Sequence, residues 1–224
     1  MGAGLAAVAL VGAVLATAPT PTAAAGLPDD VAEAMGVADG GPTEVTLGEE
    51  VVVASAAPTS AAAPTVAAND NGTLSGIGDS VMLGARSTVK EVIKGSRIDA
   101  AVSRFPGAFI GKLKKYVARD KLAPVVVLHP GTNGVLPADM MREMLDILED
   151  TPVVVVVNDN MPRSWRTPNN KVIDAVVPDY DNAVVADWYG ASKDHPEYFA
   201  SDGIHLTPSG ARAYAHLIKR SAGL

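Results

Sequence analysis

The sequence contains no cysteine in its 224 residues. This absence excludes disulfide bonds, thiolate catalysis and cysteine-based zinc sites. The four histidines form no HxH or HxxxH pair, which is the spacing that a helix or strand needs to present two histidines to one metal ion. The sequence therefore predicts a protein without a catalytic metal and without another cofactor.

Basic residues are missing from the first 85 positions, and the first lysine or arginine is Arg86. Eight of the 25 acidic residues lie in residues 26–73, which leaves 17 acids against all 18 lysines and arginines in residues 74–224. The net charge of −7 therefore belongs to the N-terminal part, which we interpret as a solvated spacer. No basic stripe is present, so nucleic acid is not expected as a partner.

Residues 1–25 carry no charge and include the almost entirely apolar run AGLAAVALVGAVLATA, Ala3–Ala18. As a helix this run spans roughly 24 Å, which is short of a hydrocarbon core of ~30 Å. Its length, and the small residues Ala23-Ala24-Ala25 before Gly26, are typical of a signal peptide, although no positive region precedes it. A membrane-anchor helix is the competing interpretation. Both predict an extracytoplasmic protein, secreted or membrane-tethered.

Residues 26–72 are rich in Ala, Pro, Thr and Gly, as in the stretch ASAAPTSAAAPTVAAND. Such a composition buries too little apolar surface to offset the entropy lost on ordering. We therefore interpret residues 26–72 as a mostly disordered acidic linker that leads into one folded domain, residues 73–224.

From Thr73 onward, strand-like runs alternate with helical spacing of apolar residues. The last helix has a well-marked start, with Thr207 as N-cap and Pro208 as its first residue. Repeated β-α units predict an α/β fold, a three-layer α/β/α sandwich with a five-stranded parallel sheet. The five expected strands are residues 73–78, 98–102, 125–129, 153–157 and 182–187.

Polar residues follow each expected strand, at the edge of the sheet where ligands bind in such folds. Ser80 lies in GIGDSVMLG, where the first strand gives way to a helix. A serine hydroxyl needs a base to act as a nucleophile, and the base needs an orienting group. His205 and Asp202, three residues apart before the last helix, fit those two roles. The sequence therefore predicts Ser80 as nucleophile, His205 as base and Asp202 as the group that fixes the imidazole tautomer.

An oxyanion hole is expected beside Ser80. The backbone N–H of Ser80 lies at a helix N-terminus, with the helix dipole behind it, and can face a developing negative charge. Asn133, in a glycine-flanked loop, can supply a second donor through its side-chain amide. The alternatives are plain structural roles: Ser80 as a helix cap, Asp202 as a turn cap and Asn133 as a loop residue. Asp79 is expected to order the turn, with no part in proton transfer.

The sequences GDSV at 78–81, GTNG at 131–134 and DGIH at 202–205 resemble blocks I, III and V of the SGNH (GDSL-type) hydrolase superfamily. The resemblance covers residues 73–224 and is stronger to the extracytoplasmic SGNH domains of membrane acyltransferases, such as peptidoglycan O-acetyltransferases. It implies a flavodoxin-like SGNH fold and the catalytic roles given above. The chain departs from the family at VSRFPG, where many members have a block II glycine, and at GTNG, where GxND is usual.

Other residues after the expected strands are candidates for substrate binding. Two of them stand near the place of the block II glycine, so a third oxyanion donor is left open, and the aromatic ones could stack on a sugar ring. Packing of the loops against the core is the alternative for the aromatic residues, and His195 is a competing base. The candidates are Ser103, Arg104, Arg163, Trp165, Trp188 and Tyr189.

These features together predict a serine acyl-transfer enzyme with an acyl-Ser80 intermediate, either an esterase or an O-acyltransferase. Expected partners are an acyl ester or acetyl donor and a carbohydrate or small-molecule acceptor, with cell-envelope glycans favoured. A transferase would also need a separate membrane acyl-donor protein, unless this sequence is a fragment or a separated domain of such an enzyme. The alternatives are a small lipase or thioesterase with the same three residues, and a catalytically silent envelope-binding module that keeps the fold.

Overall fold

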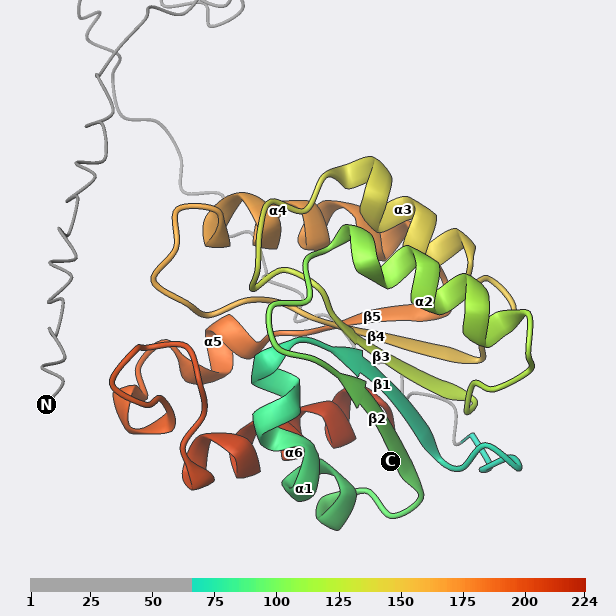
Figure 1. Ribbon diagram of the computed structural model, residues 1–224, viewed down its shortest axis with the longest axis horizontal. Coiled ribbons are helices and arrows are strands. Elements are labelled where there is room, and N and C mark those ends of the chain that lie inside the picture. The colour runs from blue at the N-terminus through green and yellow to red at the C-terminus, as the bar shows by residue number, and fades with distance from the viewer. Residues whose placement is uncertain (1–65) are drawn as a thin grey trace, which may run out of the picture. The chain divides into compact units, whose positions relative to one another are not determined.

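The computed structural model describes residues 66–224. The expected signal or anchor segment, residues 1–25, and most of the expected linker lie outside the described residues. The described chain begins with strands and helices that alternate regularly (Figure 1). In chain order the elements are β1 (Leu74–Gly78), α1 (Ser80–Val92), β2 (Ser96–Ala100), α2 (Gly107–Val117), β3 (Val125–His129), α3 (Ala138–Asp146), β4 (Val153–Val157), α4 (Arg166–Val176), η2 (Val177–Asp179), β5 (Ala183–Ala186), α5 (Trp188–Ser192), η3 (Pro196–Tyr198) and α6 (Pro208–Ser221).

The five strands form one parallel sheet in the order β2-β1-β3-β4-β5. Helices α2, α3 and α4 cover one face, and α1, α5 and α6 cover the other (Figure 1). Each strand-to-helix connection starts from the carboxyl end of its strand, so the loops that follow the strands gather at one edge. The predicted three-layer α/β/α fold is confirmed.

Alternate residues of the central strands face opposite layers, because side chains along a strand point to opposite sides. In β3, Val125 and Val127 pack with residues of α1 and α6, whereas Val126 and Leu128 pack with residues of α2, α3 and α4. Strands β3 and β4 are buried along their whole length. Burial of each aliphatic side chain contributes about 1.5–3 kcal/mol, so the two continuous valine-rich runs mark the centre of the sheet.

The edge strands differ from prediction more than the central ones. β2 occupies Ser96–Ala100, two residues earlier than the expected 98–102, and Val102 is exposed beyond it. β2 is half-buried and pairs on one side only, so its apolar pattern is a weak guide to its bounds. β5 lies within the expected range, and the strands at 125–129 and 153–157 agree with prediction.

The packed structure also starts before Thr73. Residues assigned to the end of the linker form a turn closed by an Asn69–Gly72 bridge. Asn71 is buried, and its amide donates to the backbone oxygens of Asp120 and Leu122 at 2.9 and 3.2 Å. This turn therefore fastens the start of β1 to the segment that precedes β3.

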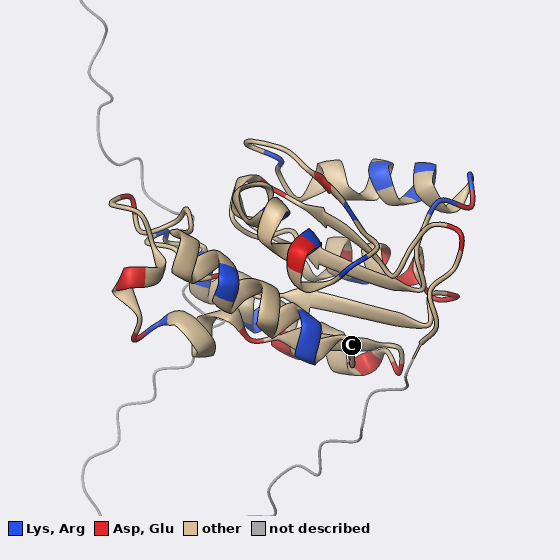
Figure 2. Ribbon diagram, turned by 90° about the horizontal axis from the view of Figure 1, so that it is seen from below, with Lys and Arg blue, Asp and Glu red and all other residues tan. Residues whose placement is uncertain are grey.

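Charged residues of both signs are interspersed over the described elements (Figure 2). Helix α2 carries basic residues and the loops around it carry both signs. Within residues 66–224, none of the helices combines the length and the apolar character needed to cross a membrane.

Candidate active site

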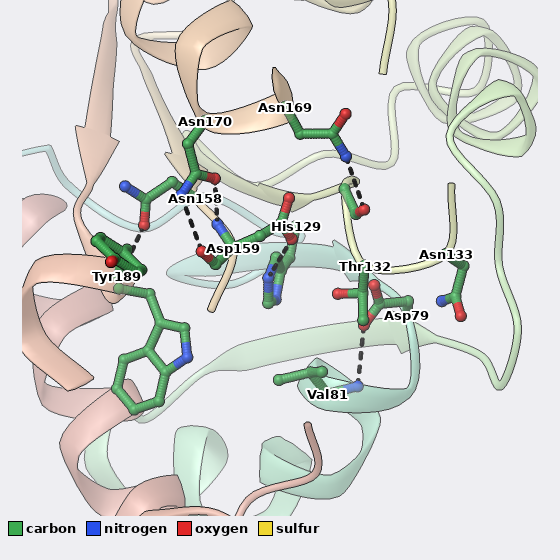
Figure 3. Close-up of polar contacts among 12 residues, drawn as sticks. Asp79, Val81, His129, Thr132, Asn133, Asn158, Asp159, Asn169, Asn170 and Tyr189 are labelled. Atoms are coloured by element: carbon green, nitrogen blue, oxygen red, sulfur yellow. Dashed lines mark hydrogen bonds and ion pairs between the residues drawn. The ribbon is translucent and has the colours of Figure 1, made fainter. Parts of the chain in front are cut away.

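Ser80 is the first residue of α1 and follows β1 by one residue. Asp79 caps the helix: its Oδ1 accepts from the Val81 N–H at 2.9 Å, and the side chain is fully buried (Figure 3). Glycine at 78 lets α1 start against the strand, because a Cβ there would lie 2.5 Å from Cβ of Met82. A similar argument holds at Gly76 but not at Gly84, where a Cβ would meet open space. The turn is tight because small residues and a buried cap allow it.

The structure brings Ser80, His205 and Asp202 together across 125 residues of sequence. Nε2 of His205 lies 3.0 Å from Oγ of Ser80, and Nδ1 of His205 lies 2.6 Å from Oδ2 of Asp202. Both distances lie within hydrogen-bond range. With Nδ1 donating to the carboxylate, Nε2 is left as the acceptor for the Ser80 hydroxyl proton.

The loop that carries His205 is itself held by hydrogen bonds. Oδ1 of Asp202 accepts from the backbone N–H groups of Ile204 and His205 at 2.9 and 3.0 Å. The Ala200 N–H donates to the His205 carbonyl at 2.7 Å, and Gly203 adopts a φ of 67° that favours glycine. Asp202 therefore orients the imidazole and the backbone that bears it.

The hydrogen bond from His205 is the largest cause that lowers the pKa of Asp202, to about 2, and the two backbone N–H groups act in the same direction. Asp202 is therefore ionised at any pH at which esters are usually assayed. The side chains of His205 and Asp202 are 49% and 45% exposed, so a substrate can reach them from solvent.

Asn133 lies on the loop after β3, and Asp79, the neighbour of Ser80, lies on the adjoining turn after β1 (Figure 3). The Asn133 amide donates to the Arg104 carbonyl at 3.3 Å. An amide nitrogen carries two protons, so one remains for a ligand. Ser80 offers its own N–H, which as part of the first helical turn has no acceptor within the helix. The two expected oxyanion donors thus come from neighbouring loops at one edge.

Two of the residues proposed for substrate binding are placed elsewhere by the structure. Trp188 is 1% exposed and packs against Tyr214, Tyr198 and Phe199, so it belongs to the core and cannot stack on a sugar. Arg104 is also buried, and its guanidinium binds Asp99 at 2.5 Å. These two predictions are wrong because a position after a strand does not fix the direction of its side chain.

The other four stay candidates. Ser103 is exposed on the loop after β2, with a φ of 55°, and Arg163 is exposed before α4. Trp165 is half-buried, and its indole N–H donates to the Thr132 carbonyl at 3.3 Å, which places the ring against the Asn133 loop. Tyr189 is half-buried beside Arg166, whose guanidinium lies 4.9 Å from the ring centre.

His195 does not join the site. Its Nδ1 lies 2.8 Å from the Glu197 carboxylate, and its ring stacks on Tyr198. A hollow of about 340 Å³ lies beside the His205 loop and is lined by Arg166, Lys193 and Gly203 among others. Its lining does not include Ser80, Asn133 or His205.

The structure also contains a buried polar group behind this edge of the sheet, which the sequence does not indicate. Nε2 of His129 lies 3.3 Å from Oδ1 of Asp159 (Figure 3). Nδ1 of His129 lies 3.0 Å from the Tyr214 hydroxyl. Burial works against charge on His129, but the Asp159 carboxylate 3.3 Å away and the nearby Asp79 raise its pKa overall. Burial raises the pKa of Asp159. In the sequence they are marked only as the last residue of one buried strand, β3, and the second residue after another, β4.

No family model matches this sequence. A search of curated proteins finds 37% identity over 142 residues with peptidoglycan O-acetyltransferase OatA of Listeria monocytogenes, which is 63% of this chain and 22% of that protein. O-acetyltransferase OatA of Staphylococcus aureus is 35% identical over 146 residues, 65% of this chain and 24% of that protein. The chain therefore matches less than a quarter of the length of these relatives.

Among solved structures, the C-terminal catalytic domain of Streptococcus pneumoniae OatA aligns with a TM-score of 0.61 at 22% identity, over 67% of this chain and 94% of that domain. A lipolytic protein of the G-D-S-L family from Veillonella parvula aligns with a TM-score of 0.55 at 15% identity, over 65% and 94%. The chain is thus similar in sequence to O-acetyltransferases, and it shares its fold with an OatA catalytic domain and with a G-D-S-L protein. The resemblance seen in the sequence is thereby confirmed.

Proposed function

We propose that this SGNH domain transfers an acyl group, through an acyl-Ser80 intermediate, to or from a hydroxyl of a cell-envelope glycan. The observation that carries the proposal is the hydrogen-bonded series Ser80–His205–Asp202, at 3.0 and 2.6 Å, open to solvent at the edge of the sheet. The curated relatives named as peptidoglycan O-acetyltransferases support acetyl as the group and peptidoglycan as the glycan.

The first half-reaction forms the acyl-enzyme. Nε2 of His205 takes the Ser80 hydroxyl proton as Oγ attacks the ester carbonyl carbon, and the carbonyl electron pair moves onto oxygen. The Ser80 N–H and the free proton of the Asn133 amide stabilise that oxyanion. When the tetrahedral intermediate collapses, the bond to the leaving oxygen breaks and His205 returns its proton to that oxygen. Asp202 stays ionised throughout and stabilises the imidazolium.

The second half-reaction reverses these steps with a new nucleophile. His205 deprotonates a hydroxyl that attacks the acyl carbon, and collapse returns the proton to Ser80. A sugar hydroxyl gives O-acyl transfer, and water gives hydrolysis. Because the same residues serve both, the outcome depends on whether a glycan hydroxyl or water reaches the acyl carbon.

The reaction is proposed to take place outside the cytoplasm, where peptidoglycan lies, with residues 1–25 as the export or anchoring segment and residues 26–65 as part of the linker. The acyl donor would reach Ser80 from a separate membrane protein or as a soluble acyl ester. The residue boundaries 25/26 and 72/73 stay predictions, and residues 69–72 already contact the segment before β3.

The test compares two products of the full chain. Purified protein is incubated with nitrophenyl acetate, with and without peptidoglycan fragments, and both acetate release and acetylated glycan are measured. We expect acetyl transfer to the glycan, with Ser80→Ala inactive at an unchanged melting temperature. Acetate release alone, with or without glycan, would make the protein an esterase. A preference for long acyl chains would favour a lipase, and turnover by Ser80→Ala would reject the mechanism.

A further inference from the structure

Helix α4 sends one fully buried amide side chain into the loop that carries Asn133. Asn169 is 0% exposed, and its side-chain amide points toward the loop after β3 (Figure 3). Its Nδ2 donates to the carbonyl oxygens of Gly131 and Gly134 at 2.9 and 2.8 Å. Its Oδ1 accepts from the Leu136 N–H at 2.8 Å. Both N–H donors and the oxygen acceptor of this side chain therefore bond to the backbone of one loop, residues 131–136.

These three bonds enclose Asn133 on both sides. They fix one backbone group two residues before it and two groups after it, across a stretch with glycines at 131 and 134. Gly134 has a φ of 147°, a conformation that few other residues adopt. Glycines give a chain conformational freedom, so a loop with this composition needs outside contacts to keep one shape.

The residue before α4, Trp165, makes a further hydrogen bond to the same loop, at Thr132. The Trp165 indole N–H donates to the Thr132 carbonyl at 3.3 Å. The Asn133 amide itself reaches the Arg104 carbonyl at 3.3 Å. The start of α4 thus holds the backbone of residues 131–136, while the loop after β2 holds the Asn133 side chain.

We propose that Asn169 is a positioning residue for catalysis, which holds Asn133 where its free amide proton meets the oxyanion. The inference rests on the proposed function. A displacement of about 1 Å in a catalytic group can cost ~10²-fold in rate. A bond set that fixes the backbone on both sides of Asn133 is suited to prevent such a displacement.

The chemistry of the side chain explains why asparagine stands there. A serine offers one donor and cannot span two carbonyls and an N–H together. An aspartate keeps the size but has no N–H, so it would place a carboxylate against two carbonyl oxygens in a buried site. Only an amide of this length presents two donors and one acceptor in one plane.

The experiment is a double-mutant cycle on the full chain: wild type, Asn133→Ala, Asn169→Ser and the double variant. For each, kcat and KM for nitrophenyl acetate and the melting temperature are measured. We expect Asn169→Ser to lower kcat by about tenfold or more with KM almost unchanged. In the Asn133→Ala background the same change should lower kcat by less than about twofold, because the group that Asn169 positions is gone.

Asn182 provides a matched control at the other end of the sheet. Its Nδ2 donates to the carbonyl oxygens of Leu148, Glu149 and Thr151 at 2.8 to 3.3 Å. Like Asn169, it therefore holds the backbone of one loop through a single side-chain amide. Asn182→Ser should lower the melting temperature and leave kcat within about twofold of wild type. A loss of stability by itself is thereby separated from a loss of positioning.

Equal losses of kcat from Asn169→Ser in both backgrounds, or no loss in wild type, would overturn the inference. If Asn169→Ser does not fold, the same double-mutant cycle is made with Trp165→Phe, which removes only the indole hydrogen bond to Thr132. We expect Trp165→Phe to lower kcat by about threefold in wild type and to leave kcat unchanged in the Asn133→Ala background. A persistent loss there would count against the proposal. Failure of the proposed function is recognised separately, because Asn133→Ala or Ser80→Ala would then leave kcat unchanged.

Discussion

Asp202→Asn should remove most of the activity and leave the fold intact. The two carboxylate oxygens have different tasks, since Oδ1 accepts from two backbone N–H groups and Oδ2 accepts from Nδ1 of His205. In asparagine one of these positions becomes an NH2 group. If the NH2 faced the backbone it would meet two donors, so the amide is expected to place it toward His205. Nδ1 must then accept, and the imidazole proton moves to Nε2, which can no longer take a proton from Ser80.

The size of the effect follows from the exposure of the pair. Replacing the aspartate of a buried serine-protease triad by asparagine lowers kcat by ~10⁴. Here the Asp202 and His205 side chains are 45% and 49% exposed, so water can hydrate the imidazole and restore part of the correct tautomer. We therefore expect a loss of about 10²–10³ in kcat, which corresponds to about 3–4 kcal/mol of transition-state stabilisation.

The assay is the steady-state hydrolysis of nitrophenyl acetate by the full chain, with melting temperatures measured in parallel. Asp179→Asn is the control, because Asp179 is an exposed acid paired at 3.5 Å with Arg142 on the surface, and kcat should stay within about twofold of wild type. An Asp202→Asn protein that melts normally and keeps more than about a tenth of the wild-type kcat would refute the reasoning about the tautomer.

Three further changes test the packing around the site. Gly131→Ala should destabilise the protein by about 1–3 kcal/mol or more, because the new Cβ would lie 1.8 Å from Oδ2 of Asp159. Gly111→Ala is the control and should not destabilise the protein, because its Cβ would meet open space. Equal melting temperatures of the two variants would contradict this. Trp188→Ala should cost about 3–5 kcal/mol in denaturant unfolding with KM for a glycan acceptor unchanged; a raised KM at unchanged stability would restore Trp188 to the binding site. Burial raises the pKa of Asp99, but hydrogen bonds from Arg104, Tyr116 and Lys112 lower it overall, from 3.8 to about 2. The stability that Asp99 adds is then complete above pH 3.8 and lost as the pH falls to about 2, so wild type and Asp99→Asn should converge in stability over that range; a constant difference would contradict the assignment.

The centre of the sheet could be predicted from the sequence because it is buried on both faces. The runs at 125–129 and 153–157 leave no ambiguity about which residues lie inside, and the structure has the same bounds. The predicted bounds of β2 differ from the observed ones by two residues, because an edge strand needs fewer apolar side chains and its sequence pattern is weaker. The arrangement Ser80–His205–Asp202 could be proposed because each member follows a strand or precedes a helix at the same edge, which the topology of a parallel sheet brings together.

Side-chain directions and distant polar contacts could not be predicted in the same way. Trp188 and Arg104 follow strands as Ser80 does, yet both turn inward. The Trp188 ring is stabilised by burial in the core, and the Arg104 guanidinium binds the Asp99 carboxylate. Asn169 acts across 33 to 38 residues of sequence, and His129 meets Tyr214 across 85. No local pattern encodes such contacts, since they depend on how α4 and α6 pack on the sheet.

The central claim is that an acyl group is carried on Ser80. The direct measurement is rapid quenching of the full chain with nitrophenyl acetate, followed by mass spectrometry of the intact protein and of its peptides. The account predicts one acetyl group, located on Ser80, that forms before the steady state and is absent from Ser80→Ala. Turnover with no acetylated intermediate, or with acetyl on another residue at a competent rate, would contradict it.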